Sequence, residues 1–156
     1  PWTRRVSQAS FRIFAIASAL SRNGTRGWND GRSGFLDIYN FVREEIGHGR
    51  ARMRLGFREH HVRSGGKMAG SSMMALADFS AYAALMGAIG PVLMAVTSSL
   101  SINFLRRPEA AEMVADARIV KSTRRLAFTV VDLYTAGETS PIAHVTATYA
   151  IPRIKA

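Results

Sequence analysis

The sequence predicts a single α+β domain in which an antiparallel sheet of about five strands wraps around one long central helix. Residues 70–90 are apolar on nearly every helical face, which is typical of a helix buried on all sides. Residues 96–151 contain four segments of alternating apolar and polar residues, and a fifth such segment lies at residues 50–57. An apolar helix placed between one strand and four others needs a curved sheet to cover it.

The chain length of 156 residues allows one domain with a substantial core and is too short for two. Residues 1–34 differ from the rest, because Arg4 and Arg5 precede a short apolar stretch at Phe11–Leu20 that Arg12 interrupts. A secretory signal has a longer apolar run without an internal charge. We therefore expect a weakly ordered or helical N-terminal extension at residues 1–34, followed by the domain at residues 35–156.

The segment before the long helix contains two predicted elements and a loop. Apolar residues at near-helical spacing in residues 35–46 predict a short amphipathic helix that ends at Gly47. Residues 50–57 alternate between arginine and apolar side chains, which predicts a half-buried strand. Residues 58–69 follow as a loop that contains two adjacent histidines and the Gly65-Gly66 pair.

The long helix is expected to begin near Ser71 or Ser72, which are suitable capping residues, and to end at Gly90. A membrane span is the competing interpretation. Asp78 lies near the middle of the segment, where a carboxylate costs about 2.5–3.5 kcal/mol on insertion. We therefore expect a core helix, and the absence of cysteine favours a reducing compartment such as the cytoplasm.

Four predicted strands follow the helix and are connected by short turns. They cover residues 96–104, 114–121, 126–134 and 142–151. Turn residues separate them at positions 106–108, 122–123 and 136–138. Such short connections are typical of antiparallel neighbours, so these strands are expected to form a meander.

The formal net charge of +10 comes mainly from arginines that are spread along the chain. A basic surface attracts polyanions, including an acyl carrier with a nucleotide tail. Neither a basic run interleaved with aromatic residues nor zinc-finger spacing is present, so nucleic-acid binding is not expected as the main role. The histidines and carboxylates lack ligand spacing, and we expect neither a metal nor another cofactor.

Asp78 is the most informative residue of the predicted helix. Between Lys67 and Arg106 it is the only Asp, Glu, Lys, Arg or His. A buried carboxylate without a charged partner costs several kcal/mol unless it is hydrogen-bonded or neutral. Such a residue is either a candidate for a functional site or a structural Asp that backbone and hydroxyl groups satisfy.

Two other residues extend this candidate site. Ser98 is the only polar residue on the apolar face of the strand at residues 96–104, so its hydroxyl could hold the carboxylate or a water molecule. Gly70 opens the helix, where free backbone N–H groups and the helix dipole favour negative charge. Each residue also has a simpler interpretation. Ser98 would be a small residue tolerated near a strand end, and Gly70 would be an ordinary glycine at the start of a helix.

Gly70 and Asp78 are eight residues apart, or about 12 Å along one helix. One helix therefore cannot place both against one small reacting group. If both act together, Gly70 of one subunit must meet Asp78 of another, and this predicts an obligate dimer.

Two motifs resemble those of the PaaI-type hotdog thioesterases. One is Gly65-Gly66-Lys-Met-Ala-Gly70-Ser-Ser-Met-Met-Ala-Leu-Ala-Asp78, and the other runs from Ala95 through Ser98 and Asn103 to Arg106. The resemblance covers about residues 50–151. It implies a dimer or tetramer that acts on acyl-coenzyme A, with Asp78 as nucleophile or general base, the Gly70 N–H polarising the thioester carbonyl, and Ser98 as an assisting hydroxyl.

The chain departs from the family pattern at the start of the helix. Ala69 stands where the family has His, and Ser71 replaces its second glycine. His61 and Arg63, in the preceding loop, lie near the family's upstream Asn position. We expect His61, Arg63 and Ser71 to contact the substrate, although an exposed position is the simpler expectation for a loop histidine.

The leading hypothesis is an acyl-CoA thioesterase with Asp78, Gly70 and Ser98 at its catalytic centre. Four arginines beside the meander turns are candidates for binding the coenzyme phosphates: Arg106, Arg107, Arg124 and Arg125. The first alternative is a non-catalytic hotdog module that binds acyl-CoA or another apolar ligand. A basic nucleic-acid-binding or assembly domain and an acyl-thioester hydratase or dehydratase are further alternatives.

Overall fold

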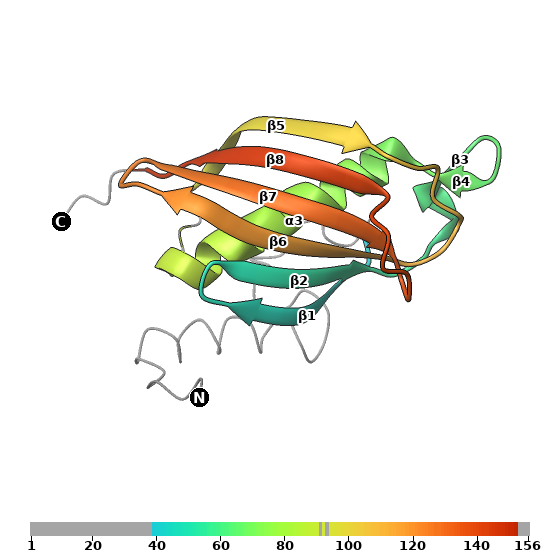
Figure 1. Ribbon diagram of the computed structural model, residues 1–156, viewed down its shortest axis with the longest axis horizontal. Helices are drawn as coiled ribbons and strands as arrows, with labels where there is room; N and C mark the ends of the chain where they lie inside the picture. Colours follow the sequence, from blue (N-terminus) through green and yellow to red (C-terminus); the bar gives the residue numbers. More distant parts are fainter. Residues whose placement is uncertain (1–38, 91, 93, 153–156) are drawn as a thin grey trace.

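The computed structural model describes residues 39–90, 92 and 94–152, and it contains a curved antiparallel sheet around one long helix, α3 (Figure 1). Six strands form the sheet in the order β1-β2-β6-β7-β8-β5. Their bounds are Phe41–Gly47 (β1), Arg50–Leu55 (β2), Val96–Phe104 (β5), Met113–Ser122 (β6), Leu126–Thr135 (β7) and Ala143–Ala150 (β8). The predicted hotdog architecture and all five predicted strands are confirmed.

The sixth strand, β1, corrects the predicted helix at residues 35–46. Residues 41–47 pair antiparallel with β2 through a turn at His48 and Gly49, and Gly49 adopts the left-handed φ of 70°. The apolar residues of so short a segment fit both the helical and the strand periodicity, and pairing with β2 selects the strand. Phe41 stacks on Phe79 of α3 at a centroid distance of 4.6 Å. Residues 35–38 and the predicted extension at 1–34 lie outside the described residues.

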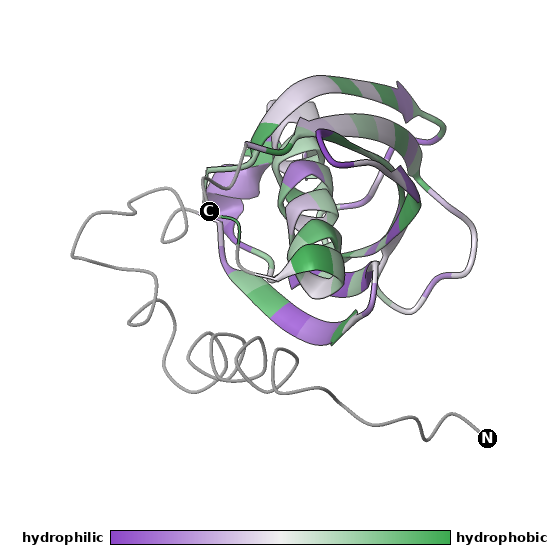
Figure 2. Cartoon of the chain, turned by 90° about the vertical axis from the view of Figure 1, so that its left-hand side faces the viewer, coloured by the Kyte–Doolittle hydropathy of each residue, from purple (hydrophilic) through white to green (hydrophobic). Residues whose placement is uncertain are grey.

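Helix α3 (Gly70–Ile89) lies within the curve of the sheet, as the end-on view in Figure 2 shows. Its buried residues include Leu76, Ala77 and Leu85, which pack in the main hydrophobic core. Length and apolar composition would allow this helix to cross a membrane. Because its apolar faces pack against the protein's own sheet, α3 is the core helix of a soluble domain.

The ends of α3 differ in part from the prediction. The N-cap residue is Ala69, and no side chain caps the helix. Ser72, expected as a cap, donates its hydroxyl hydrogen bond to the carbonyl oxygen of His61 at 3.3 Å. Gly90 ends the helix as predicted, with a φ of 87° and its N–H on the carbonyl oxygen of Met86.

A short structured segment connects β2 to α3. It contains the 3₁₀ turn Glu59–His61 and a small hairpin of β3 (Val62–Arg63) and β4 (Lys67–Met68). Gly65 and Gly66, at the tip of the hairpin, both have positive φ. The predicted loop is therefore a hairpin whose turn uses the glycine pair.

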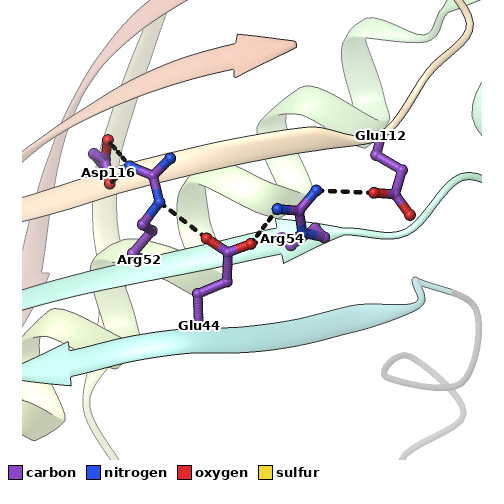
Figure 3. Close-up of polar contacts among 5 residues, drawn as sticks. All are labelled: Glu44, Arg52, Arg54, Glu112 and Asp116. Carbon is purple, nitrogen blue, oxygen red and sulfur yellow. Dashed lines mark hydrogen bonds and ion pairs between the residues drawn. The ribbon is translucent and has the colours of Figure 1, made fainter. Parts of the chain in front are cut away.

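The outer face of the sheet carries a network of ion pairs across β1, β2 and the start of β6 (Figure 3). Arg52 contacts Glu44 and Asp116, and Arg54 contacts Glu44 and Glu112. Burial alone would raise the pKa of Glu44, but hydrogen bonds from Arg54 and Arg52 outweigh burial and lower it. The network joins the edge strand β1 to the interior of the sheet.

Candidate functional site

Asp78 lies in the middle of α3, and its carboxylate contacts two hydroxyl groups from the sheet. Thr97 of β5 donates a hydrogen bond to Oδ1 at 2.7 Å, and Tyr149 of β8 donates to the same oxygen at 2.6 Å. The Tyr149 hydroxyl also lies 2.8 Å from the main-chain oxygen of Asp78. Within the described residues, no cation forms an ion pair with this carboxylate.

A β-bulge in β5 places Thr97 beside Asp78. Thr97 pairs with Tyr149 and Ser99 pairs with Thr148, so Ser98 is the extra residue between two regular pairs. Residues paired across antiparallel strands point to the same face of the sheet. Tyr149 points inward, and Thr97 therefore points inward with it.

The bulge corrects the prediction that Ser98 holds Asp78. The Ser98 hydroxyl donates instead to the carbonyl oxygen of Thr148 at 3.1 Å. Strict alternation from Leu100 would place Ser98 on the inner face of the sheet. Because Ser98 is an extra residue, Thr97 takes the inner position instead. A bulge has no reliable signature in such a polar run, so the alternating pattern indicated a hydroxyl on this strand but selected Ser98 in place of Thr97.

Tyr149 is a site residue that the sequence interpretation missed. It belonged to the apolar face of the last predicted strand and counted as core. The side chain is only 2% exposed, and its ring lies 6.0 Å from that of Tyr82. Burial and the hydrogen bond to Asp78 raise the pKa of Tyr149 above its ordinary value. The phenol therefore remains protonated, and able to donate, at neutral pH.

Gly70 is the first residue of α3, as the resemblance requires for a carbonyl-polarising N–H. The first N–H groups of a helix have no partner within it and carry the positive end of its dipole. A Cβ atom at residue 70 would lie 3.2 Å from the Phe104 ring. The end of β5 therefore covers the start of α3, and glycine leaves space between them.

His61 is buried, with 1% of its surface exposed, although exposure is ordinary for a loop histidine. Its ring stacks near Tyr39 at 5.9 Å, and its carbonyl oxygen accepts hydrogen bonds from the Ala69 N–H and the Ser72 hydroxyl. His61 thus fixes the chain that enters α3. Arg63 and Ser71, the other predicted substrate contacts here, are exposed.

The four candidate phosphate-binding arginines divide into two groups. Arg106 is used within the protein, where it donates to Glu138 and to the carbonyl oxygens of Ser140 and Pro141. Arg107, Arg124 and Arg125 are exposed, and the described residues form no ion pair with them. Arg124 and Arg125 occupy the β6–β7 turn, near the end of the sheet that holds Thr97.

Two surface hollows lie away from Asp78. One of about 410 Å³ lies on the outer face of the sheet and is lined by Arg50, Arg52, Arg118, Asp116 and neighbouring residues. A second, of about 270 Å³, lies near the end of α3 beside Arg50 and Ala88. Asp78 lines neither hollow, so a substrate pocket around it needs surfaces beyond these two.

Comparison with known proteins identifies relatives in sequence and structure. The family model of the thioesterase superfamily matches residues 65–142. A protein from a Silicibacter species, described as a candidate thioesterase, is 38% identical, with a TM-score of 0.66 over 72% of this chain and 79% of that chain. A mutant of the phenylacetic acid degradation protein PaaI from Thermus thermophilus is 25% identical, with a TM-score of 0.67 over 77% of this chain and 100% of that chain.

A more distant structure supports the fold alone. The zebrafish thioesterase superfamily member 2 is 19% identical, with a TM-score of 0.69 over 96% of this chain and 100% of that chain. No curated protein matches the chain in sequence. The matched family segment contains Gly70, Asp78 and Thr97.

Proposed function

Because the chain belongs to the thioesterase superfamily, we propose that it hydrolyses acyl-coenzyme A thioesters, with Asp78 acting on the thioester. The observation that supports this role most directly is the setting of Asp78. Its carboxylate lies in an apolar helix and contacts hydroxyl groups rather than a cation. A carboxylate that no ion pair neutralises keeps its capacity to act as a base or nucleophile.

The proposed reaction is ordinary acyl transfer to water. Asp78 removes a proton from a water molecule that attacks the thioester carbon, or attacks that carbon itself. The carbonyl oxygen becomes an oxyanion, which collapses as the C–S bond breaks. In the water route this releases the acid and the coenzyme A thiolate, which takes the proton held by Asp78. In the direct route the thiolate leaves and takes a proton from water, the acyl group remains on Asp78 as a mixed anhydride, and a second water molecule hydrolyses that anhydride to the acid and the free carboxylate.

The oxyanion needs a donor, and Gly70 of the same protomer lies too far from Asp78 to supply one. Gly70 and Asp78 are separated by about 12 Å on α3. We propose that the partner subunit's Gly70 donates its N–H to the oxyanion formed beside Asp78, as preorganised N–H groups do in acyl-transfer enzymes. The active species is accordingly a homodimer.

The position of β5 supports this dimer. It is an edge strand, so one side of its backbone has no neighbouring strand within the described chain. Thr97, near one end, contacts Asp78, and Phe104, at the other end, covers Gly70. Antiparallel pairing of two β5 strands about a twofold axis near Leu100 and Ser101 would bring each Thr97 opposite the other subunit's Phe104.

The basic surface suits the phosphates of coenzyme A. Arg107, Arg124 and Arg125 are exposed and form no ion pair with the described residues, and they are the preferred candidates for the phosphate contacts. Arg106 is a weaker candidate because its guanidinium already contacts Glu138, Ser140 and Pro141. His61 has a supporting role in this proposal, since it fixes the entry to α3.

The deciding experiment compares the wild-type chain with Asp78→Asn on short, medium, long and aromatic acyl-CoA esters, with free thiol as the readout. We expect the variant to lose about 100- to 10,000-fold in kcat/KM on the best substrate. Binding of that acyl-CoA, measured by calorimetry, should persist because the amide has nearly the same shape.

Asp132→Asn is the matched control, because Asp132 lies on the outer face of the sheet and pairs with His144. It should keep wild-type turnover. Undiminished turnover in Asp78→Asn would disprove the proposed role of Asp78. Acyl-CoA binding by a wild-type protein that hydrolyses no ester in the panel would instead favour the non-catalytic hotdog module.

A further inference from the structure

We propose that Tyr149, acting with Thr97, gives the two carboxylate oxygens of Asp78 different roles: Oδ1 is held by the sheet, and Oδ2 is the oxygen that acts on the substrate. Tyr149 is in this view a positioning residue. The inference rests on the proposed function, because it specifies how Asp78 would be presented to the thioester.

The two oxygens of Asp78 have different surroundings. Oδ1 accepts hydrogen bonds from Tyr149 at 2.6 Å and from Thr97 at 2.7 Å. No hydrogen bond from another described residue reaches Oδ2. Two donors on one oxygen restrict rotation of the carboxylate about its terminal torsion, which is otherwise soft. Oδ2 therefore keeps its lone pairs for a water molecule or a carbonyl carbon.

Tyr149 fixes more than the side chain of Asp78. The same hydroxyl lies 2.8 Å from the main-chain oxygen of that residue, so one phenol links β8 to both the backbone and the carboxylate. A purely structural tyrosine would be satisfied by the main-chain oxygen alone. The shorter contact to Oδ1 indicates that the charged group is the principal acceptor.

The environment of Tyr149 suits a fixed donor. Its side chain is buried in the main core, and its residue pairs directly with Thr97 across the β5–β8 ladder. Between Lys67 and Arg106, Asp78 is the only charged residue and Tyr82 the only other titratable one. Because the phenol is neutral and nearly immobile, it donates to Asp78 without competing with it for a proton.

The consequence for chemistry concerns the geometry of the carboxylate. Holding Oδ1 orients the lone pairs of Oδ2, and orientation of a catalytic group contributes directly to rate. Loss of Tyr149 should therefore reduce kcat, while the KM for the substrate changes little.

The test uses the full chain with Tyr149→Phe, which keeps the ring and removes only the hydroxyl. We expect kcat to fall about 10- to 100-fold, the range for loss of a hydrogen bond to a charged group. We expect the KM for the substrate to stay within about twofold of the wild-type value, because a positioning residue acts on the reacting group and not on substrate binding. Tyr134→Phe, which removes a phenol from the outer face of the sheet, is the matched control and should change neither quantity.

A second measurement does not depend on turnover. The carboxyl-carbon resonance of Asp78, assigned by its loss in Asp78→Asn, can be recorded by NMR at one fixed pH in protein labelled with ¹³C-aspartate. Its chemical shift should change in Tyr149→Phe and stay unchanged in Tyr134→Phe. If Tyr149→Phe folds poorly, the pair Thr97→Val and Thr97→Ser tests the other donor to Oδ1, with Ser expected to retain the wild-type chemical shift.

The outcomes separate this inference from the proposed function. Wild-type kcat and an unchanged Asp78 carboxyl resonance in folded Tyr149→Phe would overturn the inference, and loss of activity in Asp78→Asn would then still support the proposed function. A changed resonance in a protein that hydrolyses no ester would support the assignment of Oδ1 and overturn the enzymatic role.

Discussion

Thr97 and Tyr149 are direct partners across the β5–β8 ladder, and both donate to the same oxygen of Asp78. This relationship exists because Ser98 is a bulged residue, which lets Thr97 face the helix. The carboxylate is therefore held by a cross-strand pair whose two residues come from chain segments about fifty positions apart.

Replacing Thr97 by Val should lower kcat/KM about 10-fold or more, because a hydrogen bond to a charged group is lost at nearly constant volume. Ser98→Ala is the neighbouring control and should change kcat/KM by about twofold or less, since Ser98 contacts only a main-chain carbonyl oxygen. Steady-state kinetics on the best acyl-CoA ester provide the comparison. A larger loss of kcat/KM in Ser98→Ala than in Thr97→Val would instead support Ser98 as the assisting hydroxyl.

Gly70→Pro should lower kcat about 100- to 1,000-fold by removing the proposed oxyanion donor. Proline suits the first position of a helix, and Ala69 already has the extended conformation that proline requires before it, with φ −72° and ψ 140°. Gly70→Ala keeps the N–H and introduces the same contact with Phe104. Equal losses in the two variants, measured at matched folded fractions, would show that crowding rather than the N–H is responsible.

A mixed dimer tests whether the site is shared between subunits. A protomer with Asp78→Asn and a protomer with Gly70→Pro each lack one component, so both homodimers should be inactive. Their heterodimer, isolated with two different affinity tags, retains one complete site and should recover about half of the wild-type kcat per dimer. An inactive heterodimer would place both components within one protomer.

Gly87→Ala should destabilise the fold by about 1–3 kcal/mol. Alanine ordinarily favours a helix over glycine by about 1 kcal/mol. At residue 87, however, a Cβ would overlap the carbonyl oxygen of Gly47 and crowd Ile46. Gly47→Ala is the control, because its Cβ would meet open space. Urea unfolding of both variants gives the free energies, and equal stabilities would contradict the close packing of α3 on β1.

Glu44→Gln should make stability less sensitive to acid. The folded-state pKa of Glu44 is lowered from its ordinary value of 4.5, so its stabilising effect is present above about pH 4.5 and is lost as the pH falls through the lowered value. At pH 7 the variant should be about 1 kcal/mol less stable, because surface ion pairs contribute little each. The unfolding free energies of the wild type and the variant should differ at pH 7 and converge at pH 3. A difference that stays constant between the two pH values would contradict this linkage.

Much of the fold followed from periodicity alone. The helix at residues 70–90 and the four later strands have long, regular patterns, and the curved sheet follows from their order. Residues 41–47 were predicted as part of a helix because a short segment fits both the helical and the strand periodicity. Their pairing with β2 is a tertiary effect that the local pattern does not contain. The N-cap was also missed, since Ala69 has no side chain that signals it.

The candidate site was predictable only in part. Asp78 is conspicuous in sequence because it is the only charged residue in a long apolar region. Thr97 and Tyr149 depend on the register between β5 and β8, and a single bulged residue sets that register. A pattern along one strand does not reveal which residue faces a helix across a bulge, so the supporting hydroxyls required the structure.

The arrangement of β5 limits how this protein can diverge. Its inward side supports the carboxylate, while its outer backbone edge, which pairs with no other described strand, is the place where we propose that a second copy pairs. Replacing the strand by that of a relative would alter subunit recognition and the support of Asp78 together. Chimeras should therefore exchange α3, β5 and β8 as one block, and libraries that vary acyl preference should leave this block intact.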